Sequence, residues 1–193
     1  AYVGFTYASP VLTWGGAIAG LIIVIIAVFN RKRSALWAPL YAGFEGLFVG
    51  GVSAMYATLG GGIILQAVSL TLLVFFVMLV IYKSGIIPVT NKFRTGVIMA
   101  TGAIFLLYVI SMVMSMFGVH MPMIHEGGTF GILFSIGVIG IAALNLLLDF
   151  DLFEKAEEYQ APDYMEWFAG MSLLITIVWI YIEVLRLLSK MRN

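Results

Sequence analysis

The chain has 193 residues, of which 62% are hydrophobic and only 10% are charged. Soluble domains carry about 25% charged residues, so the composition excludes a soluble globular domain and a disordered chain. The chain has no cysteine, which excludes a disulfide-bonded scaffold, and its ten basic and ten acidic residues balance, which argues against a nucleic-acid-binding protein. The sequence therefore predicts an all-α, polytopic membrane helix bundle.

Six apolar segments are long enough to cross a bilayer, which requires about 20 helical residues. The second is the least apolar because it contains Glu45, and we expect Pro39 in its first turn, where a missing N–H costs little. An acidic segment ending at Glu166 follows the fifth span, and a basic tail with Lys190 and Arg192 follows the sixth. The expected spans are residues 11–29, 37–58, 63–82, 96–117, 129–148 and 167–188, within a single transmembrane domain of residues 1–193.

Lys and Arg residues concentrate in the loops after the first, third and fifth spans. Because basic loops stay in the cytoplasm, residues 31–33 and 83–94 are predicted to be cytoplasmic. The basic tail falls on the opposite side, so either its charges are tolerated outside or the last helix is short or re-entrant. The loop with His120 and His125 is expected to be a surface loop, since a metal site needs more ligands than it clearly offers.

Glu45 is the residue most indicative of function, because it lies about 12 Å into a hydrocarbon core about 30 Å thick. The functional interpretation is an ion or proton site facing the bundle interior, and the structural alternative is a protonated glutamate hydrogen-bonded to a neighbouring helix. Gly43, Gly46 and Gly50 surround it, and Gly46-x-x-x-Gly50 is a pattern that lets helices approach closely. Such packing would place Glu45 against a partner helix rather than against lipid.

Asp149 and Asp151 lie at the end of the fifth span. Carboxylates two residues apart point about 200° apart on a helix, so one is expected to face the bundle and the other the loop. The sequence does not decide which aspartate faces the bundle. Asp151 can also pair with Lys155. The two aspartates form either a solvated cytoplasmic surface or an acidic vestibule that concentrates cations.

Two further acids lie in the last span. Glu183 precedes Arg186 by three residues, which predicts an ion pair near the interface or, alternatively, an inward carboxylate that faces the same cavity as Glu45. Glu166 is expected to be a first-turn acid favoured by the helix dipole, and a place in the ion pathway is its alternative role.

Three stretches resemble the Bax inhibitor-1 family. The segment Tyr41-Ala-Gly-Phe-Glu45-Gly, which continues to Ser53, resembles the family's Glu-Gly span. Two further stretches resemble the bacterial branch of the family. One is Leu144-Asn-Leu-Leu-Leu-Asp149-Phe-Asp151 together with residues 161–167, and the other is the ending from Trp179 to Leu188. The likeness covers essentially the whole chain, in order.

The resemblance implies a seven-helix fold with the last helix at its centre. This chain supplies six helices, so the first would precede Ala1 and residues 1–10 would form an external loop. The resemblance also implies a pH-sensitive calcium leak, a bacterial inner membrane and a link to an AAA membrane protease. Calcium is expected as the transported ion. We expect no cofactor and no enzymatic activity.

In the family, a pair of aspartates on the last two helices closes the pore. Asp151 matches the first, whereas the position of the second falls at Leu174, which cannot titrate. Glu45 matches the family's intramembrane glutamate. We therefore expect a cation leak with calcium near Glu45 and Asp151, or alternatively a non-conducting protease partner docked through a mobile acidic segment, residues 149–166. An intramembrane hydrolase is disfavoured, because Glu45 has no evident acidic partner at matching depth.

Overall fold

The computed structural model describes residues 1–60, 62–118 and 128–192, and every regular element in this part of the chain is a helix. Six of these helices are long and apolar enough to cross a membrane, which confirms the predicted all-α, polytopic membrane fold. The elements are α1 (Tyr2–Thr6), α2 (Pro10–Phe29), the 3-10 helix η1 (Arg31–Arg33), α3 (Ser34–Ala57), α4 (Ile63–Lys83), α5 (Asn91–Met116), α7 (Thr129–Glu158) and α8 (Tyr164–Arg192).

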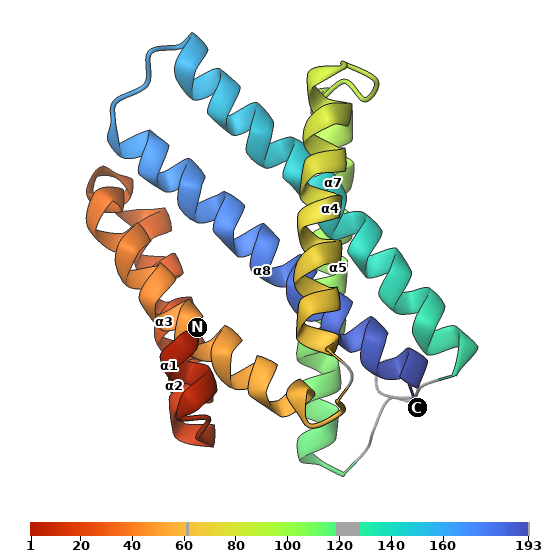
Figure 1. Cartoon of the computed structure of the whole chain (residues 1–193). Coiled ribbons are helices and arrows are strands. Elements are labelled where there is room, and N and C mark those ends of the chain that lie inside the picture. Colours follow the sequence, from red (N-terminus) through yellow and green to blue (C-terminus); the bar gives the residue numbers. More distant parts are fainter. Residues whose placement is uncertain (61, 119–127, 193) are drawn as a thin grey trace. The chain divides into compact units, whose positions relative to one another are not determined.

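The chain separates into two compact units. Unit 1 comprises Ala1–Ile64 and Asp149–Val178, and unit 2 comprises Leu65–Leu148 and Trp179–Asn193. The long helices α7 and α8, drawn in teal and blue in Figure 1, each contribute one part to each unit. The single domain expected from the sequence stays a prediction.

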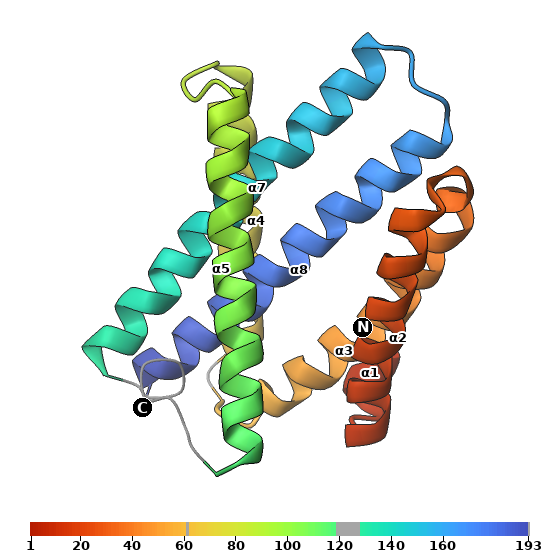
Figure 2. The ribbon, with the colours of Figure 1, turned by 180° about the vertical axis from the view of Figure 1, so that it is seen from behind.

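Glycines let the first helices of unit 1 approach closely. Helix α2 lies beside α3, and α1 lies along α3 as well (Figure 2). A Cβ atom at Gly16 would lie 2.7 Å from the Phe44 carbonyl oxygen, and one at Gly50 would lie 2.7 Å from the Phe5 backbone nitrogen. Small residues at such contacts allow helix backbones to meet. The expectation that residues 1–10 form a loop is wrong at α1, because this contact holds a short helix against α3.

Helices α2, α3 and α8 share the apolar core of unit 1. The guanidinium of Arg31 lies 5.1 Å from the centroid of the Phe168 ring, which adds a cation–π contact between η1 and α8. The buried core residues are Ile23, Ala27, Ala38, Tyr41 and Met171.

Unit 2 is tied together by polar contacts between helices. Asn145 of α7 donates to the Thr101 hydroxyl of α5 (2.8 Å), and Arg192 of α8 donates to the Gln66 side chain of α4 (3.0 Å). Such bonds between membrane helices contribute about 0.6 kcal/mol each on average. Large apolar side chains such as Leu73 stay exposed, as expected of helices that face lipid.

Helix α3 begins earlier than predicted. The Ser34 hydroxyl donates to the Arg31 carbonyl oxygen (2.6 Å), so η1 continues directly into α3. Pro39 therefore lies inside the helix and not in its first turn, where we expected it. It removes one intrahelical hydrogen bond, the one that the Ala35 carbonyl would accept.

Helix α5 also begins earlier than predicted. The Thr90 hydroxyl accepts a hydrogen bond from the Phe93 N–H (3.2 Å), which caps the helix and places its start at Asn91. Lys92 and Arg94 consequently lie in the first turn of α5 and not in a loop.

The fifth span does not end where its hydropathy falls. Helix α7 continues through the first acidic residues to Glu158, and Lys155 supports this extension by pairing with Asp151 one turn earlier (2.9 Å). The mobile segment predicted for residues 149–166 is therefore wrong over residues 149–158, which are helical.

The predicted C-terminal tail is also wrong. Helix α8 continues to Arg192, and Lys190 is buried inside the structure, with only 6% of the residue exposed. A lysine near a helix end can fold its charged group back to polar partners in a neighbouring helix, which hydropathy does not reveal.

Candidate functional site

Glu45 faces α2 inside unit 1. It lies on α3 one turn after the buried Tyr41, whose hydroxyl lies close enough to interact with the carboxylate. On α2, a Cβ atom at Gly20 would lie 3.1 Å from Glu45 Oε2, so the missing side chain leaves space for the carboxylate. Glu45 is half-buried and lies against a neighbouring helix.

The position of the family's second aspartate lies in the apolar core. Leu174 packs with Ile175 of the same helix against the core cluster that contains Tyr41 and Met171. Leu174 therefore serves as a packing residue in this chain and offers no group that titrates.

Asp149 links α7 to α8. It is 5% exposed, and its Oδ1 accepts a hydrogen bond from the Ser172 hydroxyl (2.6 Å). Thr176, one turn further along α8, contributes a second hydroxyl beside the carboxylate. Oδ2 is buried and has no hydrogen-bond partner in the described part of the chain. A buried carboxylate with one oxygen that lacks a hydrogen-bond partner costs free energy.

Asp151 is engaged within its own helix. Its Oδ2 accepts from Lys155 Nζ at 2.9 Å, which confirms the predicted i, i+4 pair. Both aspartates are buried, so the expectation that one of them faces the loop is wrong. Asp149 accepts the hydrogen bond that Ser172 of α8 donates.

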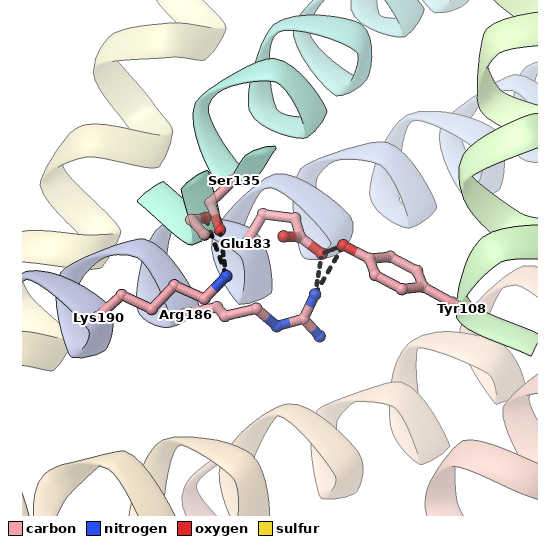
Figure 3. A network of polar contacts seen from close by, with 6 residues as sticks. Tyr108, Ser135, Glu183, Arg186 and Lys190 are labelled. Atoms are coloured by element: carbon pink, nitrogen blue, oxygen red, sulfur yellow. Dashed lines mark hydrogen bonds and ion pairs between the residues drawn. The ribbon is translucent and has the colours of Figure 1, made fainter. Parts of the chain in front are cut away.

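A second buried carboxylate lies in unit 2. Glu183 is 1% exposed, and its Oε1 accepts hydrogen bonds from the Tyr108 hydroxyl (2.8 Å) and from Arg186 (2.7 Å), as Figure 3 shows. The predicted pair with Arg186 is confirmed, but it is buried. Glu45 belongs to unit 1 and Glu183 to unit 2, so neither unit brings them together.

Lys190 extends this network toward α7. Its ammonium donates to the Gly131 carbonyl oxygen and to the Ser135 hydroxyl, each at 3.0 Å. Glu183 and Lys190 are seven residues apart and lie on one face of α8. That spacing is the signal by which the sequence could have revealed Lys190, whereas the role of Tyr108 had no local signal.

The remaining predicted residues lie at the surface or at helix contacts, or outside the described residues. Glu166 is exposed in the first turn of α8, as the helix-dipole interpretation expects. A Cβ atom at Gly46 would lie 2.9 Å from the Ala1 nitrogen, whereas one at Gly43 would meet no atom within 4 Å, so Gly43 differs from the expected packing. The histidines His120 and His125 lie outside the described residues.

Unit 1 offers oxygen ligands of the kind that hard cations prefer. Asp149 supplies a carboxylate, and the Ser172 and Thr176 hydroxyls lie beside it. Within residues 1–60, 62–118 and 128–192, no three acidic or histidine side chains gather into a metal cage. This site could therefore hold a passing cation through a single carboxylate and hydroxyls.

A comparison with family models identifies the chain's relatives. The model described as Bax inhibitor 1 like matches residues 1–193, the full length of the sequence. The chain belongs to this family. No curated protein and no solved structure matched the chain in the corresponding searches. As a Bax inhibitor 1 family member with six membrane-spanning helices, it is an integral membrane protein.

Proposed function

We propose that this Bax inhibitor 1 family protein is a pH-sensitive leak pathway for cations, with calcium as the conducted ion. The observation that carries the proposal is the Asp149 carboxylate, buried in a membrane-spanning helix with one oxygen unpartnered among the described residues. An ionised group inside a membrane costs several kcal/mol, and such residues mark ion pathways and proton relays.

Glu45 supplies a second carboxylate in unit 1. The space beside Gly20 accommodates it between α2 and α3, with the Tyr41 side chain nearby. Carboxylate oxygens attract divalent cations, and a site with few ligands binds them weakly enough to release them. Glu45 and Asp149 therefore act as separate, weak stopping points for the ion.

Protonation of Asp149 links the leak to pH. A hydrogen bond to an ionised acceptor is roughly twice as strong as one between neutral groups. Neutralising Asp149 therefore weakens the bond that Ser172 donates from α8, and it removes the negative charge that attracts the cation. Ser172 thus takes the place of a second carboxylate in the contact between the two helices.

We further propose the bacterial inner membrane as the location. The basic residues of η1 and the segment 83–94 would lie in the cytoplasm, because Lys and Arg residues are retained there. No catalysed reaction is part of the proposal.

Calcium entry into liposomes tests this function. The purified protein is expected to give flux above that of empty liposomes. Glu45→Gln keeps the shape of the side chain but removes its charge, so flux should fall about fivefold or more, the effect of about 1 kcal/mol. Asp163→Asn, in the exposed turn between α7 and α8, is the matched control and should leave flux unchanged.

A second candidate rests on the acidic surface that remains on α7. Its last turns expose Glu154, Glu157 and Glu158, which could dock a basic surface of a membrane protease. Liposomes that hold folded, helical protein but show no flux would contradict the leak. Co-purification with a protease, lost when these three acids are replaced by glutamine, would support the docking role instead.

A further inference from the structure

Unit 2 contains a pocket that the proposed cation pathway does not use. It lies between α5 and α8 and has a volume of about 310 Å³, at the lower end of the range for small-molecule sites. Its walls are largely apolar and include Ile104 and Phe105 from α5 and Trp179 and Ile182 from α8. A lipid chain is the natural occupant of an apolar pocket between helices that are exposed to the bilayer.

One end of the pocket is charged. Arg186 lines it, and 29% of the arginine side chain is exposed. Its guanidinium lies 4.9 Å from the centroid of the Tyr108 ring and donates to both the Tyr108 hydroxyl and Glu183 (2.7 Å each). These contacts hold the planar group in one orientation. A fixed guanidinium at the end of an apolar pocket suits a phosphate group.

Basic side chains outnumber acidic ones in the described part of unit 2. Glu183 is the only acidic side chain in the described part of unit 2. It pairs with Arg186, and Lys190 is also close enough to interact with it. In Figure 3 the second oxygen of Glu183 is turned toward the side of Ser135 and Lys190, away from Tyr108. Among the described contacts of unit 2, Arg186 and Lys190 share the single Glu183 carboxylate, an arrangement that favours an anionic ligand. The basic residues of unit 2 are Lys83, Lys92, Arg94, Arg186, Lys190 and Arg192.

The depth of Arg186 also suits a lipid headgroup. It precedes the last residue of α8, Arg192, by six residues, which corresponds to about 9 Å along the helix. A long arginine side chain can extend from that depth to the phosphate layer. Tyr108, which contacts Arg186, is a residue type that membrane proteins place at this level.

We propose that the pocket between α5 and α8 binds one anionic phospholipid, with its phosphodiester at Arg186 and an acyl chain along Phe105 and Trp179. Basic pockets between membrane helices bind anionic headgroups. Glu183 also lines the pocket, and its Oε1 accepts the hydrogen bond that Arg186 donates. Together with the Tyr108 hydroxyl, it holds the guanidinium in position at the end of the pocket.

Quenching of Trp179 fluorescence by brominated lipids tests the site. The full chain is placed in phosphatidylcholine vesicles that contain a small, equal fraction of brominated phosphatidylglycerol or brominated phosphatidylcholine. The difference in quenching between the parent protein and Trp179→Phe measures how much brominated lipid lies in the pocket. It should favour phosphatidylglycerol about fivefold, the effect of about 1 kcal/mol for one cation near the lipid surface.

Two variants locate the headgroup. Arg186→Gln should remove the preference for phosphatidylglycerol, whereas Lys92→Gln, with the same loss of charge in the first turn of α5, should retain it. If Arg186→Gln does not fold, Ile104→Phe keeps the charges and fills the pocket, and should reduce quenching by both lipids. Equal quenching by the two lipids in the parent protein would overturn the proposal. A preference that survives Arg186→Gln, or displacement of the lipid by soluble glycerol phosphate, would also overturn it.

Discussion

Replacing Glu183 by leucine is expected to destabilise the protein by about 3 kcal/mol. The carboxylate accepts hydrogen bonds from Arg186 and Tyr108, and both donors lose their acceptor in the variant. Removing one partner of a buried ion pair costs about 3–5 kcal/mol, because the other charge stays behind without compensation. The lower end applies here, since part of the Arg186 side chain is exposed and can be solvated.

Chemical unfolding in lipid–detergent micelles measures this effect. The double variant Glu183→Leu/Arg186→Leu should recover most of the lost stability, because no unpaired charge remains at the pair. Lys155→Ala is the control: its side chain is 42% exposed, so its pair with Asp151 should contribute less than about 1 kcal/mol. A loss below 1 kcal/mol for Glu183→Leu would show that the network does not hold α8 to α5.

Ser172→Ala is expected to cost about 1.5–3 kcal/mol, the usual range for a hydrogen bond to a charged group. The Ser172 hydroxyl donates to one oxygen of Asp149, and the other oxygen has no partner in the described part of the chain. In the variant, the Thr176 hydroxyl would remain near the buried carboxylate, in the part of the chain that the structure describes.

The same unfolding measurement checks this prediction against a matched control. Thr71→Val removes a buried hydroxyl that donates to the carbonyl of Ala67 within its own helix (2.8 Å), so its cost should be smaller. Asp149→Leu/Ser172→Ala, which removes both partners, should be closer to the wild type than Ser172→Ala alone. Equal losses for Ser172→Ala and Thr71→Val would mean that the contact between α7 and α8 has no special weight.

Much of the fold could be predicted from the sequence, because a run of about 20 apolar residues without charge indicates a membrane-spanning helix. The ends of the helices could not. Hydropathy treats Asp151 and Lys190 as residues that leave the membrane, whereas pairing with Lys155 and with Ser135 keeps them inside helices. Partners one turn away can be recognised in a sequence, but Ser135 is 55 residues from Lys190.

The candidate sites show the same division. The Glu183–Arg186 pair follows from helical spacing and was predictable, but the Tyr108 hydroxyl, 75 residues away from Glu183, was not. Similarly, the sequence presented Asp149 and Asp151 as equivalent candidates. The structure distinguishes them, because only the packing of α7 against α8 in unit 1 brings Ser172 to Asp149.

The pH dependence of calcium flux in Asp149→Asn tests the central claim most directly. Flux into liposomes is compared for the wild type, Asp149→Asn and the control Asp163→Asn between about pH 6 and 8, a range in which buried carboxylates can titrate. Wild type and control should show the same pH-dependent flux. Asp149→Asn keeps an acceptor for Ser172 but cannot titrate, so its flux should not change with pH. A pH profile in Asp149→Asn identical to that of the wild type would contradict the account.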